Sequence, residues 1–179
     1  MRSAKLSVVI LLISLLAACG FKLRGSAELP GYKLPFATIA LGLAPTSEFY
    51  ALMKRSIEAS SPGTLVVEDA QQAEAVMSVL GDSSQKNILS LNASGRAREF
   101  QLIRTFSFKV NGSGASAGAT YIAPSTITLR REITFSDDLV LSKESEEILL
   151  WRDIQGDLVQ QLMRRLASAK PQPVKVDRE

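Results

Sequence analysis

Residues 100–110, Phe100-Gln101-Leu102-Ile103-Arg104-Thr105-Phe106-Ser107-Phe108-Lys109-Val110, decide the fold of this chain. Every even position except that of Arg104 is apolar, whereas the odd positions are mainly polar. Successive side chains of a strand point to opposite faces, so this alternation predicts an antiparallel strand with one covered face. Other parts of the chain must supply the elements that cover it.

The segment before this strand predicts its antiparallel neighbour. Residues 75–80 and 88–91 are strand-like, and Gly-Asp-Ser-Ser at 81–84 separates them or forms a bulge. Asn-Ala-Ser-Gly at 92–95 is typical of a turn. The two segments therefore predict a hairpin with residues 100–110.

The segment after this strand predicts a second hairpin. Residues 112–118 contain only Gly, Ser and Ala and are expected to form a mobile loop. Residues 121–135 follow as a strand, with these apolar side chains in phase: Ile127, Leu129, Ile133 and Phe135. Arg104 and Arg131 interrupt the apolar positions of the two strands. They either lie near strand ends or a sheet edge, with their stems on apolar surface, or are buried functional charges.

Two amphipathic helices are expected to cover the sheet. After a short strand at 36–41, Thr46 is a suitable N-cap for a helix that ends at residues 60–63. Residues 64–68 then predict a second strand, which completes a β-α-β unit with parallel strands. The apolar stripe of this first helix consists of Phe49, Leu52, Met53 and Ile57.

A longer helix is predicted from Ser142 to about Ala169. Glutamates occupy its first turns, and Arg164 and Arg165 its last, which suits the helix dipole. Its apolar stripe consists of Trp151, Ile154, Leu158, Leu162 and Leu166. The predicted fold class is α+β: two amphipathic helices packed on one face of a mixed, mostly antiparallel sheet of about four long strands.

The N-terminus predicts a secretory signal and a lipid anchor. Residues 1–18 have a basic start and an apolar run that is too short to span a bilayer. Leu16-Ala17-Ala18-Cys19 is similar to a bacterial lipobox, in which Cys19 carries N-acyl and S-diacylglycerol groups. An ordinary signal with a chance cysteine, or an uncleaved anchor, is the alternative. Gly20 stands where lipoproteins of the inner membrane typically carry Asp, so outward sorting is favoured.

The remaining boundaries follow from this cleavage. Residues 19–35 are expected to form a lipidated extended leader, 36–169 a single α+β domain, and 170–179 a disordered tail. The segment 1–18 holds two of the 21 bases and none of the 18 acids, so 19 bases and 18 acids remain. This balance argues against a general nucleic-acid binder.

The composition also excludes several enzyme classes. The chain has no histidine, which excludes Ser-His-Asp and Cys-His catalysis and histidine metal sites. Its one cysteine, Cys19, is assigned to lipid, and no intramolecular disulfide can form. Catalysis by a pair of carboxylates stays open, although no motif places such a pair. No cofactor is indicated.

Three short motifs resemble one family. Residues 19–25, Cys-Gly-Phe-Lys-Leu-Arg-Gly, resemble the start of mature LPS-assembly lipoproteins of the LptE family. Residues 95–102 resemble a strand of that family's second hairpin, and Ser142-Lys143 resembles the start of its last helix. The order of elements also agrees, so the resemblance extends over most of the mature chain.

The resemblance implies an accessory role without enzymatic activity. Members of this family bind a large β-barrel LPS translocon (LptD-like), sit partly in its lumen, help it assemble and contact lipopolysaccharide. This implies a lipid-anchored outer-membrane protein that faces the periplasm and the barrel lumen.

The resemblance also implies a lipopolysaccharide site. The family's ligand-contacting lysine maps onto Lys143, whereas its arginine falls near Ala93 and is not matched. Arg96 and Arg98 lie in the same turn region and are the candidates to replace it. For all three cations, solvated surface charge is the alternative.

Two other functions remain open. A generic periplasmic lipid carrier or scaffold lipoprotein without a barrel partner would need an internal apolar cavity. A lipoprotein hydrolase would need two acids that converge in a cleft about 5–10 Å apart.

Overall fold

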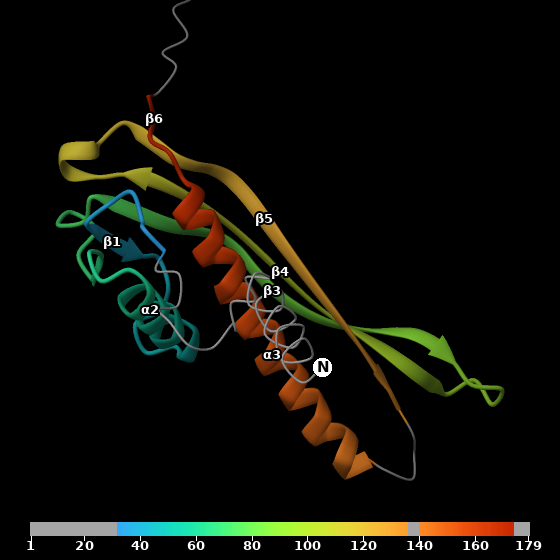
Figure 1. The fold of residues 1–179 in the computed structure, drawn as a ribbon. Helices are drawn as coiled ribbons and strands as arrows, with labels where there is room; N and C mark the ends of the chain where they lie inside the picture. The colour runs from blue at the N-terminus through green and yellow to red at the C-terminus, as the bar shows by residue number, and fades with distance from the viewer. Residues whose placement is uncertain (1–31, 136–139, 174–179) are drawn as a thin grey trace, which may run out of the picture. The chain divides into compact units, whose positions relative to one another are not determined.

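The computed structural model describes residues 32–135 and 140–173, which include a six-stranded sheet and two helices (Figure 1). The order of strands in the sheet is β2-β1-β3-β4-β5-β6. The first three are β1 (Thr38–Leu41), β2 (Leu65–Val67) and β3 (Ala75–Leu91). The others are β4 (Ala97–Gly112), β5 (Ala119–Thr134) and β6 (Gln172–Pro173). The helices are α2 (Glu48–Ser60), a short 3-10 turn η1 (Gly114–Ser116) and α3 (Val140–Ser168).

The predicted fold class is confirmed, with one change in the strands. β1 is parallel to both β2 and β3, whereas β3, β4, β5 and β6 pair antiparallel. Three strands are long instead of about four, because residues 75–91 form one continuous β3. The polar segment 81–84 continues the ladder opposite β4, and the register shifts only between Val79 and Gly81 and after Ile88.

The even positions of β4 form the covered face, as the alternation predicted. Leu102, Phe106, Phe108 and Val110 are 0% exposed. The ring of Phe106 lies edge-to-face on Phe49 of α2, with 5.5 Å between centroids. Ile154, Leu158, Leu162 and Leu166 of α3 are also buried in the same core cluster. Figure 1 shows both helices on this side of the sheet, so no helix of the described residues covers the opposite face, which we call the uncovered face.

Local chemistry moves the helix start by one residue. Ser47, and not Thr46, is the N-cap, since its Oγ accepts a hydrogen bond from the Tyr50 backbone N–H at 3.1 Å. Both residue types are good caps, so the sequence alone does not separate them. Gly42 is required just after β1, because a Cβ there would lie 2.7 Å from the Met77 carbonyl oxygen.

The structure differs from the prediction at one loop and at the C-terminal end of the described residues. The loop at 112–118 contains η1 and is tied down by the Ser113 N–H, which donates to the Glu74 carbonyl at 2.9 Å. At the C-terminus, residues 172–173 pair with β5 and so leave the predicted disordered tail. The signal, Cys19 and most of the leader lie outside the described residues, as do residues 174–179.

Arg104 is an ion-paired residue in the middle of β4, between sheet and helices. Its guanidinium donates to both carboxylate oxygens of Asp82, at 3.1 and 2.9 Å, and to Gln155 Oε1 at 3.2 Å. It also lies 4.9 Å above the ring centre of Phe49. The side chain is 12% exposed, so neither a strand end nor a sheet edge describes it. Arg131, in contrast, does lie on the outer edge of the sheet, where it pairs with Asp157.

Arg104→Met should destabilise the fold by about 1–2 kcal/mol, because it leaves the Asp82 carboxylate without its bidentate donor. Methionine retains most of the apolar stem, so packing on Phe49 changes little. Urea unfolding of Arg104→Met, Asp82→Asn and the double variant would give the coupling energy. A coupling below about 0.5 kcal/mol would mean that this ion pair does not stabilise the fold.

Candidate functional site

The three predicted ligand-contacting cations lie at one end of the sheet. Arg96 belongs to the β3–β4 turn, Arg98 is the second residue of β4, and Lys143 is in the first turn of α3. Cys19, the predicted lipid attachment site, lies outside the described residues.

The β3–β4 turn is fixed by the side chain of Asn92. Its Oδ1 accepts from the backbone N–H groups of Ser94, at 3.0 Å, and Arg96, at 2.9 Å. Gly95 has φ +76°, a left-handed conformation that glycine adopts without steric cost. The turn therefore holds the backbone of Arg96 in a defined position, with an exposed side chain.

Arg98 and Lys143 flank the end of β5. The Lys143 Nζ lies 2.7 Å from Glu146 Oε2 and 3.4 Å from Thr134 Oγ1, and its side chain is only 17% exposed. The Arg98 carbonyl accepts from the Phe135 backbone N–H at 2.7 Å. The structure thus places the Lys143 ammonium beside Thr134 and the Arg98 backbone beside the next residue, Phe135, although the two cations are 45 positions apart in the sequence.

An aromatic pair and a further lysine, which the sequence did not reveal, complete this region. The rings of Phe100 and Phe135 meet edge-to-face, with 5.9 Å between centroids. The Lys86 Nζ lies 4.5 Å from the centre of the Phe100 ring and pairs with Glu147 of α3. Lys86 follows the same parity as Ile88 in a strand-like segment, which was the only signal available. We call Lys86, Arg96, Arg98, Phe100, Phe135 and Lys143 the hairpin-end surface.

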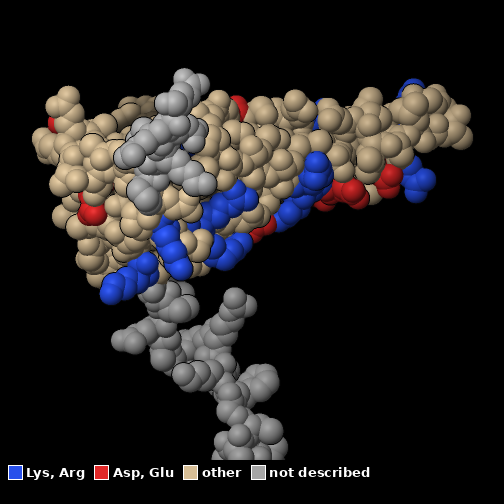
Figure 2. All heavy atoms as spheres, turned by 90° about the horizontal axis from the view of Figure 1, so that it is seen from above, with Lys and Arg blue, Asp and Glu red and all other residues tan. Residues whose placement is uncertain are grey.

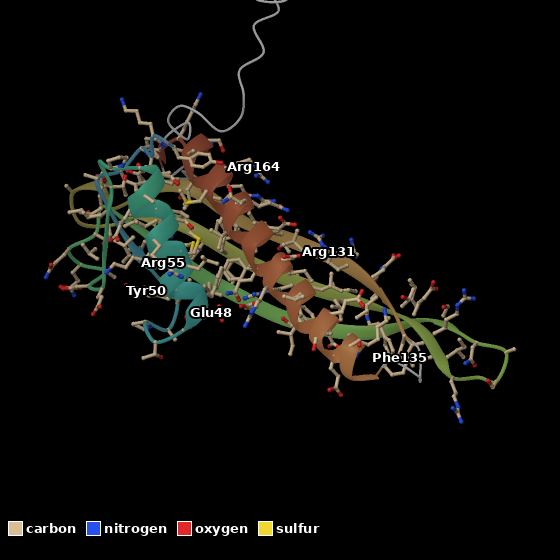
Figure 3. All side chains as sticks on the ribbon, turned by 60° about the horizontal axis from the view of Figure 1, so that its bottom comes forward. Glu48, Tyr50, Arg55, Arg131, Phe135 and Arg164 are labelled. Atoms are coloured by element: carbon tan, nitrogen blue, oxygen red, sulfur yellow. The ribbon has the colours of Figure 1, made fainter. Side chains whose placement is uncertain are left out.

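Exposed apolar side chains surround this surface. Near it, on the last part of β3 and the first turns of α3, five large apolar residues are 48–59% exposed: Ile88, Leu89, Leu91, Ile148 and Leu149. Figure 3 shows Phe135 at the hairpin end and Arg164 near the other end of α3. Cations beside exposed apolar groups fit a ligand that carries both phosphates and hydrocarbon.

The uncovered face of the sheet is rich in hydroxyls where β4 and β5 pair. The hydroxyls of Ser107 and Thr126 lie 2.8 Å apart across β4 and β5, and Thr105 pairs with Thr128 in register beside them. Figure 2 shows Lys and Arg gathered along one flank in its view, whereas most of the visible surface is uncharged. The hydroxyl-rich part of this face suits a polar protein surface better than a hydrocarbon phase.

Two of the three carboxylates near the start of α3 are engaged in ion pairs. Glu146 pairs with Lys143, and Glu147 pairs with Lys86. Among residues 32–135 and 140–173, no group of three or more His, Cys, Asp or Glu side chains is placed to hold a metal ion. In this same part of the chain, no helix has both the length and the apolar character needed to cross a membrane.

Known proteins are similar to this chain in sequence and in fold. The LptE family model, described as lipopolysaccharide-assembly, matches residues 36–166. The LPS-assembly lipoprotein LptE of Pectobacterium atrosepticum is 26% identical over 161 residues, which cover 87% of this chain and 80% of that protein. The LptE of Yersinia pestis is 27% identical over 164 residues, which cover 89% of this chain and 73% of that protein.

Solved structures of bacterial lipoproteins are also similar to this chain. Lipoprotein B of Nitrosomonas europaea is similar with a TM-score of 0.67 and 31% identity, over 83% of this chain and 91% of that one. Rare lipoprotein B of Shewanella oneidensis shares the fold, with a TM-score of 0.60 and 22% identity over 73% and 94% of the two chains. The family match covers the sheet from β1 to β5, α2 and most of α3. The chain therefore belongs to the LptE family of lipopolysaccharide-assembly proteins.

Proposed function

We propose that this chain is a lipoprotein subunit of the outer membrane, anchored through acyl groups on Cys19, that binds and helps assemble a β-barrel LPS translocon. In that complex it assists the insertion of lipopolysaccharide into the outer leaflet. The observation that carries the proposal is the family match over residues 36–166. Removal of the segment 1–18 would leave Cys19 as the first residue, followed by a short leader before β1.

Family membership establishes the general role of the chain. The chain is an envelope lipoprotein of a family that takes part in lipopolysaccharide assembly. Such proteins are accessory factors and not enzymes, which confirms the prediction that this chain is not an enzyme.

The uncovered sheet face supports a barrel partner. The lumen of a large outer-membrane barrel is lined by polar side chains. Ser107, Thr126 and Thr128 present hydroxyls on a face that such a wall can meet with hydrogen bonds, direct or through water. Away from these hydroxyls the same face also carries apolar side chains, since Ile103 and Val76 are partly exposed and Leu65 is 61% exposed. The barrel contact is therefore proposed for the hydroxyl-bearing part of β4 and β5.

The hairpin-end surface supports direct contact with lipopolysaccharide. Lipid A carries phosphates, for which Arg and Lys are the matching donors, and acyl chains, for which the exposed apolar residues are suitable. We assign phosphate contact to Lys143, Arg96 and Arg98. Lys143 is already held by Glu146, so the phosphate must compete with that carboxylate for the ammonium group.

The alternative of a lipid carrier without a barrel would require an enclosed apolar cavity. The interior between sheet and helices is occupied by large side chains that are at most 1% exposed, among them Phe106, Phe108 and Leu158. Two hollows in the described residues are surface grooves, one at residues 32–37 and 60–64 and one beside Tyr121 and Lys170. These features favour the barrel-binding function over the carrier.

Co-purification tests the proposal. Tagged full-length protein, extracted from its own host in mild detergent, is expected to retain a large β-barrel protein in stoichiometric amount through size exclusion, identified by mass spectrometry. The intact mass of the same preparation should show three acyl chains on a chain that begins at Cys19. An unrelated tagged outer-membrane lipoprotein is the control. Recovery of the protein alone, from membranes that contain the barrel, would contradict the barrel-binding function.

A further inference from the structure

The outer edge of β3 is open over most of its length. β1 pairs with β3 only at Ala75, Val76 and Met77, whereas β4 pairs with the other side of β3 as far as Leu91. In the described residues, no strand pairs with β3 beyond Met77 on that side, and no hydrogen bond is recorded to its outward backbone. An edge of this kind is a ready template for another strand.

The register shows which backbone groups point outward. The Arg98 carbonyl accepts from Phe135 after β5, so Arg98 and every second residue of β4 point toward β5. The odd residues 99–107 of β4 therefore point toward β3, and their partners there include Ser83, Gln85 and Asn87. The N–H and C=O groups of Asp82, Ser84, Lys86 and Ile88 consequently face the open edge.

The opposite edge of the sheet is closed in contrast. By the same register, Thr126 and Arg130 of β5 point outward. The Arg165 side chain donates to the Thr126 carbonyl at 3.2 Å, and the Arg131 side chain donates to the Arg130 carbonyl at 2.9 Å. Pro124 lies in the same strand, and proline on an edge strand prevents further pairing. The edge formed by β5 is thus protected against pairing with a further strand, whereas the edge formed by β3 is not, and this difference requires an explanation.

The open edge is complementary to itself. An antiparallel pairing about a two-fold axis at Ser84 places Asp82 of one copy opposite Lys86 of the other, twice. Leu80, 51% exposed, and Ile88, 59% exposed, lie at the two ends of this stretch, with Leu80 at the register shift before Gly81. The pairing would align Arg104, Asp82, Lys86 and Glu147 in a row of alternating charge across the axis, since Arg104–Asp82 and Lys86–Glu147 are already ion pairs within one copy.

We propose that residues 82–86 of β3 pair with the same residues of a second copy of this chain, which joins two sheets edge to edge. Three outward-facing residue pairs, centred on Ser84, would form about six backbone hydrogen bonds. β1 lies opposite Met77, and the register shift after Ile88 bends β3, so the pairing is limited to this stretch. This self-association is separate from the proposed barrel complex and does not depend on it.

Cysteine cross-linking in the full chain tests the proposal. Ser84→Cys places two thiols on the axis, where Cα atoms about 5.5 Å apart allow a disulfide. Oxidation of native membranes is expected to give a covalent dimer on a non-reducing gel. Asn87→Cys, exposed on the same strand, should give little, because its copies would be about 20 Å apart. Thr128→Cys, whose backbone faces the closed edge, and the wild-type chain are the further controls.

A charge reversal distinguishes this pairing from random collision. In the Ser84→Cys background, Lys86→Glu puts two acids opposite each other at both sites and should lower the dimer yield about tenfold. Glu147→Gln removes the same ion pair within one copy, leaves the edge unchanged, and should leave most of the cross-link. Equal cross-linking of the three cysteine variants, or no effect of Lys86→Glu, would overturn the proposal. The co-purification of the barrel is a separate measurement. A negative result in one experiment therefore does not contradict the proposal that the other experiment tests.

Discussion

Phe106→Ala is expected to destabilise the fold by about 3–5 kcal/mol, a large part of the stability of a typical domain. Phe106 is 0% exposed in the middle of β4. Its ring contacts Phe49 of α2 edge-to-face and stacks on Phe108 with 5.9 Å between centroids. Its removal would leave a cavity between the sheet and the helices that neighbouring side chains in regular elements cannot fill.

Urea unfolding followed by circular dichroism would measure this loss as a change in midpoint at constant slope. Phe135→Ala is the matched control, because the same ring is removed from a half-buried position at the hairpin end. It should cost much less, about 1 kcal/mol. Equal losses for the two variants would show that Phe106 does not lie at the centre of the core.

The correct part of the fold prediction rests on periodicity. In residues 100–110 the period of two predicted which side chains face the helices, and the stripe of α3 at Ile154, Leu158 and Leu162 predicted what covers them. These patterns indicate burial directly, because the period of a helix or strand determines to which face each side chain points. The parallel pairing of β1 with β2 followed from the short helix between them.

The errors arose where local chemistry was ambiguous or pairing was distant. Gly-Asp-Ser-Ser at 81–84 left a separation and a bulge open, and only the ladder with β4 decides for the bulge, since β3 continues with a register shift between Val79 and Gly81. Residues 172–173 are polar and proline-rich, and only their position beside Ala119 and Thr120 makes them a strand. A strand this short contains no detectable alternation of apolar and polar residues, so its pairing cannot be predicted from the sequence.

The candidate site was predictable only in part. Lys143, Arg96 and Arg98 could be named from the sequence, but not that Lys143 would be held by Glu146 or that Arg98 would lie beside the same strand end. Lys86 and the pair Phe100–Phe135 become neighbours only through the register of β3, β4 and β5. Proximity across strands is a property of the fold.

The combination Lys143→Glu with Arg96→Glu is expected to lower the affinity for lipopolysaccharide by about 100-fold or more, since two charge-assisted contacts to phosphate are replaced by repulsion. Equilibrium titration of the purified full-length protein with lipopolysaccharide, at fixed ionic strength, would measure it. Arg98→Glu alone should give a smaller loss. The unfolding midpoint of each variant must stay near that of the wild type for the affinities to be compared.

The most informative variant of this series is Glu146→Gln. Its carboxylate holds the Lys143 ammonium at 2.7 Å in the free protein, so its neutralisation should raise the affinity several-fold if phosphate competes for that group. Arg164→Glu with Lys170→Glu makes the same change in net charge near the C-terminal end of α3 and should leave the affinity nearly unchanged. An equal loss in this control would show that net charge alone attracts the ligand. Unchanged binding by a folded Lys143→Glu, Arg96→Glu protein would remove both residues from the site, and the exposed apolar residues of β3 and α3 would then have to carry the contact.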